Sequence, residues 1–387
     1  MPFYHKLGEI PRTKHTTFYK PDGKSLYREE LFSSKGFSGI YSTKYHIHMP
    51  TEIRRVGSAD YTAIELWGDA PLSCYHFYTQ KDRRTGDFIG ARRVFLHNAD
   101  CTIGRAKVTE NTDLFYRNAH AAEYIFIHHG TGTLHSEFGR LPFGPGDQLL
   151  IPRAVTYRME FDSLDNNVML VVESATAYEI PKHYKNEYGQ FEEHAPYSER
   201  EFKLPEYADP VDEKGEFKII VKAGGSFFEH VAGHHPFDVV GWDGYLYPFA
   251  FNIEDYHAKV GRIHLPPPIH LVFITGGFVL CNFVPRPYDF HPNAIPAPYV
   301  HSNIDSDEVL YYVKGDFMSR KGVTEGSITL HPGGMPHGPQ PGKTEASVGA
   351  KETNEYAVMI DTYRPLKLTQ AVKETNDENY VRSWLEE

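Results

Sequence analysis

The sequence predicts a mainly β protein with two strand-rich units and a short helix at its C-terminal end. Short apolar or alternating runs bounded by Gly, Pro and Asp recur along the chain, whereas helical periodicity is scarce. The 27 prolines and 32 glycines suit the many tight turns of sandwiches and barrels. With 387 residues and 40% hydrophobic content, the chain can bury one large core or two ordinary ones.

The expected strands occur in both halves of the chain. They are YTAIELW (61–67), EYIFIHH (123–129), DQLLIP (147–152), NVMLVVE (167–173), LVFITGGFVLCNF (271–283), EVLYYV (308–313) and GSITLHP (326–332). A stretch rich in charge and proline separates two groups of strands, so we expect an N-terminal unit over 1–178, a connector over 179–217 and a C-terminal unit over 218–387. The run 366–387 is the best helical candidate, with Trp384 anchoring it to the body.

The charge and the ends of the chain limit the classes of function. A formal net charge of -11 and a pI near 6.0 argue against nucleic acid and anionic membranes as partners, because both would be repelled. The chain starts without a secretory signal and contains no apolar run of membrane-spanning length, so we expect a cytoplasmic protein. Three scattered cysteines suit a reducing compartment, whereas 22 histidines offer many nitrogen ligands for a metal.

One histidine and carboxylate pattern stands out in the second unit. His301 precedes an expected strand, Glu308 begins that strand, and Gly315 follows it at a turn. In the next hairpin, GSITLHPGGMPHGP, a turn at Gly334 leads to His337. In a small double-stranded β-barrel, this spacing brings two imidazoles and one carboxylate from neighbouring hairpins to the same mouth.

Two histidines and a carboxylate with open positions are the ligand set of non-haem Fe(II) oxygenases. Zinc and manganese are chemically possible with the same residues. Singly, His301 could cap a turn, Glu308 could be a solvated strand end and His337 a loop histidine. Their joint spacing favours a metal site.

The first unit carries a degenerate version of this histidine and carboxylate pattern. NAHAAEYIFIHHG supplies His120 and Glu123, and FGPGDQLLIPRAVTYR supplies the second hairpin, but Tyr157 stands in the place of the last histidine. Without a third protein donor, iron would be held poorly, so we interpret this half as a structural barrel.

These strings resemble homogentisate 1,2-dioxygenases, two-barrel members of the cupin superfamily. The resemblance rests on the His301, Glu308 and His337 set, on SITLHPGGMPHGP, on VVGWDG followed by HLPPPI, on PYVHSN and on the terminal DENYVRSW. It implies two cupin-type double-stranded β-barrel (jelly-roll) units. It also implies Fe(2+) as the cofactor, and ring opening of homogentisate by O2 to maleylacetoacetate in tyrosine and phenylalanine catabolism. A homo-oligomer, trimer or hexamer, is implied as well.

The resemblance also assigns roles around the expected iron. Through the His-x-x-Pro-x-Ile string, His264 corresponds to the family's catalytic histidine, and its imidazole could accept a proton from a ring hydroxyl. His331 is expected to orient a ligand or a ring substituent from behind the metal. Substrate contacts are expected from the residues His331, His337, Tyr299, Asn303 and Phe317.

The sequence departs from the family at two places. The DSDE string has an extra residue before the acid, so Asp305 and Asp307 compete with Glu308, although moving the role to Asp307 would turn the side chain to the opposite face of the strand. Phe317 stands where family members have a tyrosine that contacts the ring, and the missing hydroxyl affects affinity or substrate choice.

Several questions stay open at this point. The cationic candidates for the acetate arm are Arg262, Arg286 and Arg320, and the sequence does not select among them. The same iron chemistry could act on another para-diol, such as hydroquinone or gentisate. Other readings are a zinc or manganese cupin isomerase or hydrolase that consumes no oxygen, and a non-enzymatic ligand-binding bicupin.

Overall fold

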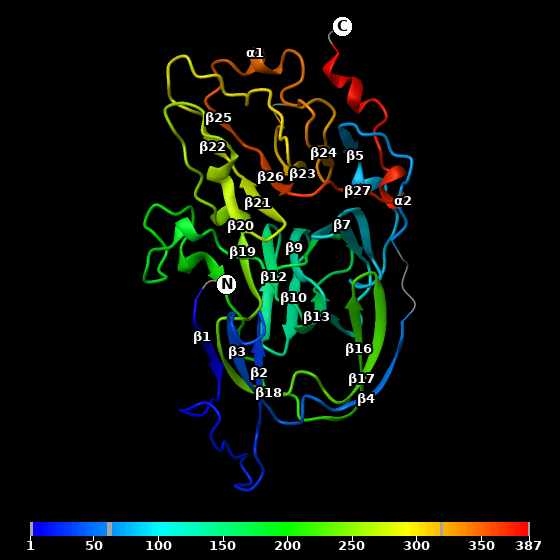
Figure 1. Ribbon diagram of the computed structural model, residues 1–387, viewed down its shortest axis with the longest axis vertical. Coiled ribbons are helices and arrows are strands. Elements are labelled where there is room, and N and C mark those ends of the chain that lie inside the picture. Colours follow the sequence, from blue (N-terminus) through cyan, green and yellow to red (C-terminus); the bar gives the residue numbers. More distant parts are fainter. Residues whose placement is uncertain (1–2, 60–63, 318–319, 386–387) are drawn as a thin grey trace.

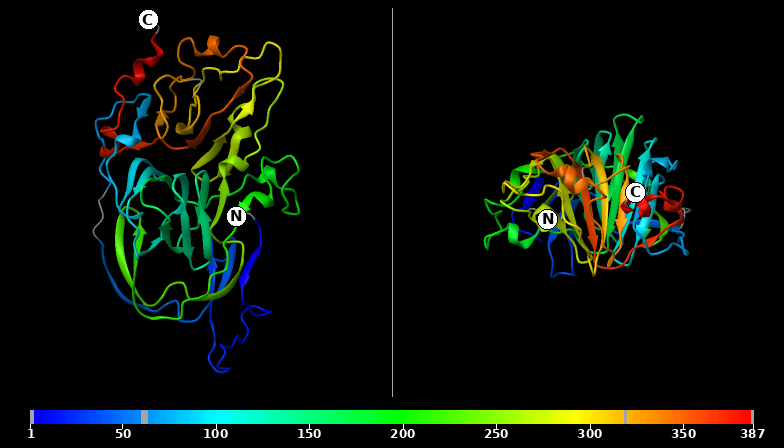
Figure 2. Two further views of the ribbon diagram at one scale, coloured as in Figure 1. Left: turned by 180° about the vertical axis from the view of Figure 1, so that it is seen from behind. Right: turned by 90° about the horizontal axis from the view of Figure 1, so that it is seen from above.

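The computed structural model describes residues 3–59, 64–317 and 320–385. The chain is mainly antiparallel β-sheet with few short helices, so the predicted fold class is confirmed. Figure 1 shows two units, a lower one rich in cyan and green strands and an upper one in yellow and orange. The side views in Figure 1 and Figure 2 place the C-terminus at the top of the upper unit and the N-terminus beside the lower unit.

Two large sheets and one smaller sheet form the lower unit. The eight-stranded sheet has the order β15 (Phe202–Lys203), β19 (Phe249–Asn252), β12 (Asp147–Ile151), β9 (Ala122–His129), β14 (Asn167–Ser174), β7 (Cys101–Val108), β6 (Arg92–His97) and β27 (Lys367–Leu368). The seven-stranded sheet has the order β11 (Gly139–Phe143), β10 (Gly132–Ser136), β13 (Thr156–Phe161), β8 (Phe115–Asn118), β16 (Lys214–Ala223), β17 (Ser226–His234) and β4 (Ile53–Ser58). The four-stranded sheet has the order β1 (His5–Gly8), β18 (Val239–Gly244), β3 (Tyr41–His46) and β2 (Arg28–Ser33).

The upper unit is built on one six-stranded sheet. Its order is β20 (Leu271–Ile274), β21 (Phe278–Phe283), β26 (Tyr356–Thr362), β23 (Asp307–Lys314), β24 (Ile328–His331) and β5 (Tyr75–Phe77). A two-stranded ribbon pairs β22 (Arg286–Pro287) with β25 (Glu352–Thr353). The central strands alternate inward and outward side chains, so one face of β23 can line a pocket while the other packs towards the lower unit.

The helices are short. The α-helices are α1 (Lys343–Ser347) and α2 (Gln370–Lys373), and the 3₁₀-helices are η1 (Thr79–Lys81), η2 (Lys182–Tyr184), η3 (Glu199–Glu201), η4 (Ile253–Asp255), η5 (Pro267–His270) and η6 (Tyr380–Trp384). The expected C-terminal helix is therefore two short pieces, α2 and η6, because the intervening residues turn towards the sheet. The Trp384 indole donates to the Gly338 carbonyl oxygen at 3.1 Å, which anchors η6 to the body as expected. No helix in the part of the chain that the structure describes is long and apolar enough to cross a membrane.

The sheets divide the chain differently from the predicted boundaries. β16 to β19, which we placed mostly in the C-terminal unit, pair with strands of the lower unit, and β16 begins inside the expected connector. Conversely, β5 from the first part of the sequence completes the upper sheet. The two units thus exchange strands, which a linear reading of the sequence does not reveal.

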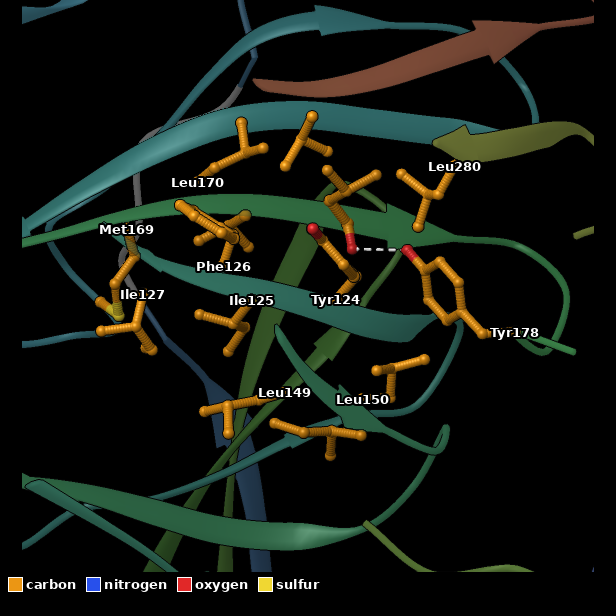
Figure 3. Close-up of a cluster of buried hydrophobic side chains, with 14 of the residues drawn as sticks. Tyr124, Ile125, Phe126, Ile127, Leu149, Leu150, Met169, Leu170, Tyr178 and Leu280 are labelled. Atoms are coloured by element: carbon orange, nitrogen blue, oxygen red, sulfur yellow. Dashed lines mark hydrogen bonds between the residues drawn. The ribbon is translucent and has the colours of Figure 1, made fainter. Parts of the chain in front are cut away.

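Most of the expected strands are present, and their apolar side chains form one core that runs through both units. Figure 3 shows Leu280 of β21 beside Tyr124 of β9 and Tyr178, whose hydroxyl donates to the Val172 carbonyl oxygen at 2.8 Å. The run YTAIELW is the exception. Residues 61–63 lie outside the described residues, and the rest forms only a single bridge between Leu66 and Thr369.

Candidate metal centre and substrate pocket

The upper sheet brings the predicted metal ligands together. Glu308 is the second residue of β23 and pairs in register with His331 at the end of β24. After β24 the chain turns back through Gly334 (φ +81°), and His337 forms an antiparallel bridge with His301 through two N–H···O bonds of 2.9 Å. The two hairpins therefore deliver both imidazoles beside the carboxylate.

The ligand atoms are close enough to share one ion. Nε2 of His301 lies 3.5 Å from Oε2 of Glu308, and Nε2 of His337 lies 3.5 Å from Oε1. One atom from each of the three residues lies within 4.8 Å of the others. Burial alone would raise the pKa of Glu308, but interactions with the imidazoles of His301 and His331 outweigh it and hold the pKa well below its usual range. The carboxylate is therefore charged.

The hydrogen-bonding state of the imidazoles fits a metal. Nδ1 of His337 lies 2.9 Å from the Met335 carbonyl oxygen and donates to it, which leaves a lone pair on Nε2. That buried Nε2 has no hydrogen-bond partner among the described residues. A buried, unpaired nitrogen costs free energy unless something binds it. Two imidazoles and one carboxylate are a donor set that suits ferrous iron, and these residues fit that group.

His331 lies directly behind the carboxylate. Its Nδ1 is 2.8 Å from Oε1 of Glu308 and its Nε2 is 3.1 Å from the Tyr380 hydroxyl. Burial lowers the pKa of His331 to about 4, so the ring is neutral. Both of its nitrogens therefore have partners, and one of them contacts Glu308 on the side away from the pocket.

The acidic residues that competed with Glu308 have other environments. Asp307 accepts from the Gly333 N–H and the Leu366 N–H, each at 2.7 Å, and thereby ties two turns together. Asp305 is exposed. Among the described residues, only Glu308 of these three acids belongs to a group that could hold a metal with His301 and His337.

A pocket of about 490 Å³ opens onto the His301 and Glu308 side chains. Its wall includes four of the predicted substrate or catalytic residues, His264, Tyr299, Asn303 and Phe317. The apolar part of the wall comes from Pro266, Pro267, Pro268, Ile269, Phe283 and Met359. A largely apolar cavity of this size with a few convergent polar groups suits a small aromatic molecule.

The His264 ring faces the pocket from the loop before η5. It packs edge-on against Tyr299, with ring centroids 5.0 Å apart, and its Nδ1 lies 3.8 Å from a carboxylate oxygen of Asp289. Burial lowers the pKa of His264, which favours the neutral imidazole that can accept a proton.

The three arginines considered for the acetate arm differ in position. Arg286 and Arg320 line the pocket, whereas Arg262 is exposed and is not one of the lining residues.

Sequence reasoning missed the acids Asp289, Glu355 and Asp361 of this pocket, and the pKa is raised at the last two. Asp361 lies in β26 directly opposite Glu308, and burial, with the nearby charge of Glu308, raises its pKa to about 8. Glu355 precedes β26, and burial raises its pKa although Arg286 and Arg320 act in the opposite direction. Asp361 is a single acid in the apolar run YAVMIDT, which is a signal that could have identified it.

The corresponding place in the lower unit is filled by protein. Arg92 donates to Glu123, and its other terminal nitrogen donates to the Tyr157 hydroxyl at 2.7 Å. Tyr157 in turn donates to Glu123 at 2.6 Å. His120 is exposed and takes no part. Arg92 was not foreseen, and nothing in the local sequence distinguishes it from other strand arginines.

Comparison with known proteins gives consistent matches. Residues 101–253 match the family described as homogentisate 1,2-dioxygenase N-terminal. The chain is 42% identical to a protein of Saccharolobus solfataricus named as a putative dioxygenase, over 99% of both chains. It is 28% identical over 288 residues to homogentisate 1,2-dioxygenase of Bradyrhizobium diazoefficiens, with coverage of 70% of this chain and 63% of that enzyme. It is 26% identical over 315 residues to the Caenorhabditis elegans enzyme, with coverage of 77% and 69%.

Solved structures give weaker likenesses. A cupin barrel protein from Leptotrichia buccalis matches with a TM-score of 0.33 and 11% identity, covering 70% of this chain and 88% of that one. A glyoxylate-induced protein from Pseudomonas aeruginosa matches with a TM-score of 0.37 and 13% identity, covering 79% and 97%.

Proposed function

Because the chain belongs to the homogentisate 1,2-dioxygenase family of cupin proteins, we propose that it is an Fe(II) dioxygenase that opens the ring of homogentisate. The observation that carries the proposal is the cluster of His301, Glu308 and His337, of which His301 and Glu308 line the pocket. These residues would supply two imidazoles and one carboxylate to the ion, the donor set of Fe(II) oxygenases that keep positions open for substrate and O2. Ferrous iron supplies the one-electron chemistry that lets O2 react with an electron-rich ring.

The chain's own residues would orient the substrate. The backbone bridge between His301 and His337 would hold the two ligand-bearing segments together, and His331 would hold Glu308 through its hydrogen bond. We propose that His264 accepts the proton of a ring hydroxyl, since its neutral ring faces the same pocket. The apolar wall would exclude water and hold the ring flat against the proline run.

We propose Arg286 as the partner of the acetate arm. Arg320 is 8% exposed, donates to the Gly338 carbonyl oxygen and lies 5.7 Å from the Trp384 ring, which suits a structural role. Arg286 is half-buried at the pocket wall, one of its terminal nitrogens donates to the Val284 carbonyl oxygen at 3.1 Å, and its guanidinium lies over Phe283 at 5.8 Å. A guanidinium at this depth can bind a carboxylate through two parallel hydrogen bonds.

The direct test is oxygen consumption by Fe(II)-reconstituted, ascorbate-protected protein given homogentisate, with absorbance recorded for a conjugated ring-opened product. Uptake together with product formation supports iron, reaction and substrate at once. A protein that binds iron but consumes no oxygen with homogentisate contradicts the substrate and directs the search to other diols. Oxygen uptake also separates this function from a zinc or manganese isomerase or hydrolase.

The Arg286 assignment is tested by substrate comparison. Arg286→Gln should raise KM for homogentisate roughly tenfold to a hundredfold, the worth of a charge-assisted hydrogen bond, and leave KM for hydroquinone unchanged. Lys259→Gln, which removes another pocket cation, is the matched control and should change neither value. If both substrates respond equally, Arg286 has a structural role.

A related para-diol is the second candidate substrate. Glu355 lies close enough to Arg286 and Arg320 for both to act on its pKa, so an acid already faces the two cations at the pocket wall. An uncharged ring such as hydroquinone would not need that charge. A kcat/KM for hydroquinone above that for homogentisate would favour this candidate.

The assembly and the base are further parts of the proposal. By the family resemblance we propose a homo-oligomer, trimer or hexamer, which mass measurement of the purified protein in solution would test.

His264→Ala should retain iron and lose about 10²- to 10⁴-fold in kcat, the usual contribution of a general base. Loss of iron instead would make His264 a ligand and overturn its assigned role.

A further inference from the structure

A second cluster of metal-type ligands lies where the two units meet. It consists of His128 and His129 at the end of β9 in the lower unit and Glu325 before β24 in the upper unit. Nε2 of His128 lies 2.9 Å from Oε1 of Glu325, and Nε2 of His129 lies 3.2 Å from the same oxygen. We propose that this cluster is a second metal site, which binds one divalent transition ion of the zinc type between the units.

The backbone is shaped to place both imidazoles together. Consecutive residues of a regular strand point to opposite faces, so neighbouring histidines would normally be apart. Here the pairing of β9 with β14 shifts register, with Val168 opposite His129 and Met169 opposite Ile127, so that His128 is the extra residue of a bulge. The two ring centroids are consequently 4.3 Å apart. A bulge that re-aims a side chain in this way is a recurrent device at binding sites.

The separations suit a tetrahedral ion. Ligands held at about 2.0–2.1 Å from zinc in a tetrahedron lie roughly 3.3 Å from one another. The two nitrogen-to-oxygen distances, 2.9 Å and 3.2 Å, are close to that value. His129 and Glu325 are 41% and 51% exposed in their side chains, so an ion can enter and water can take the fourth position.

The surroundings of His128 orient it as a ligand. Its Nδ1 is hydrogen-bonded to the hydroxyl of Tyr311 in β23. The phenol oxygen of Tyr311 can accept a hydrogen bond from the Nδ1–H tautomer of His128. An Nδ1–H donated to a fixed oxygen leaves the Nε2 lone pair for a metal, which is the usual arrangement behind ligating histidines.

The cluster is separate from the proposed iron site. Within β23, Glu308, Leu310 and Tyr312 line the substrate pocket, whereas Tyr311 points to the other face and contacts His128. A metal bound to β9 and to the turn before β24 would link the two units across their junction. We therefore expect it to stabilise the assembled protein and to leave the ring chemistry unchanged.

Zinc titration of the full-length protein, with metal analysis after dialysis, tests the site. Wild type should bind two Zn²⁺ per chain, and His337→Ala and His129→Ala should bind one each. The double variant should bind none. The matched control is His135→Ala. It removes a histidine of the lower unit that is paired with Glu160 at 3.1 Å and that belongs to neither metal-type group of the described residues, so this variant should bind two.

The readouts distinguish a metal site from a hydrogen-bonded contact. Zn²⁺ should raise the unfolding temperature of His337→Ala by a few degrees, and adding Glu325→Gln should remove that rise. If His337→Ala binds no Zn²⁺, or if His129→Ala binds as much as wild type, the cluster is a hydrogen-bonded contact only and the proposal is wrong. Because these tests use zinc and the His337→Ala background, they do not depend on the dioxygenase activity.

Discussion

In the lower unit, Glu123 is the second residue of β9, and in the upper unit Glu308 is the second residue of β23. Each carboxylate is buried within a sheet and faces the next hairpin of its unit. The partners differ. Glu123 meets the guanidinium of Arg92 and the hydroxyl of Tyr157, whereas the hydrogen-bonding partners of Glu308 are imidazoles.

The difference lies in what balances a buried negative charge. In the lower unit Arg92 is a permanent cation, and although burial alone would lower its pKa, the charge of Glu123 raises the pKa well above its ordinary value. In the upper unit one imidazole nitrogen, Nε2 of His337, is buried without a hydrogen-bond partner among the described residues. The same strand position therefore serves stability in one unit and offers a place for a metal in the other.

Glu123 has a structural reason to be present in the lower unit even without a metal. If Arg92 is retained, removing Glu123 would leave a guanidinium buried without its charge partner, so both residues must be kept or replaced together. Glu173 and Lys222 extend the same network, with Nζ of Lys222 2.6 Å and 2.7 Å from the two oxygens of Glu173. Two cations thus face two carboxylates, and this site is neutral without an added ion.

The largest expected effect comes from removing His337, the ligand that the upper unit has where the lower unit has Tyr157. His337→Ala should reduce bound iron and turnover to background, because even residues behind metal ligands are worth about 10- to 100-fold in affinity or activity. Tyr157→Phe, at the corresponding place in the lower unit, should leave iron content and turnover per folded chain unchanged. Metal analysis and oxygen uptake measure both variants. Equal loss of iron in the two variants would break the comparison.

The next effect concerns stability. Arg92→Met should lower the free energy of unfolding by about 3–5 kcal/mol, since it leaves Glu123 charged and buried without its partner. Arg93→Met, at the neighbouring residue whose Nε lies 3.9 Å from Asp82, is the control and should change it by less than about 1 kcal/mol. Urea unfolding gives both values.

A double variant sharpens this result. Arg92→Met with Glu123→Met removes both charges and fills the site with apolar volume, so it should recover most of the stability that the single variant loses. Iron content should stay at the wild-type level in all of these variants. If the double variant is as unstable as Arg92→Met alone, hydrogen bonds with Tyr157 and Tyr116 hold the lower site more than charge does.

The sequence was sufficient for the class of fold and for the clustering of His301, Glu308 and His337, because strand alternation and the turn at Gly334 fix local geometry. Gly315 illustrates the strength of such signals. Its φ is +104°, and a Cβ there would lie 2.4 Å from the Asn354 carbonyl oxygen, so a residue other than glycine would be strained at this turn.

What the sequence did not reveal depends on long-range pairing. β5 joins the upper sheet beside β24, and β27 joins the lower sheet beside β6, although each is far from its partner in the chain. Arg92 reaches Glu123 only because β6, β7, β14 and β9 are successive neighbours in one sheet. No spacing rule connects these residues, so neither the exchange of strands nor the internal cation could be inferred.

A smaller effect on iron should follow changes at His331, which pairs with Glu308 where the lower unit pairs the apolar Ile151 with Glu123. His331→Ala should weaken iron binding by about 10- to 100-fold, because Glu308 loses the donor that orients it at 2.8 Å. His331→Asn, whose amide can donate from a similar place, should restore part of that loss. Competition with a chelator of known affinity measures the change. An unaltered iron affinity in His331→Ala would make its role structural.

The smallest effect is expected at the pocket wall of the upper unit. The Phe317 ring lines the pocket and packs edge-on against Tyr312, with ring centroids 4.7 Å apart. Phe317→Tyr adds a hydroxyl at the pocket wall, and one further hydrogen bond of about 1 kcal/mol should lower KM for homogentisate about fivefold with little change in kcat. Phe283→Tyr, at another part of the wall, is the control and should not lower KM. A raised KM in Phe317→Tyr would mean that the pocket selects a substrate with an apolar edge at this position, and would favour a different diol.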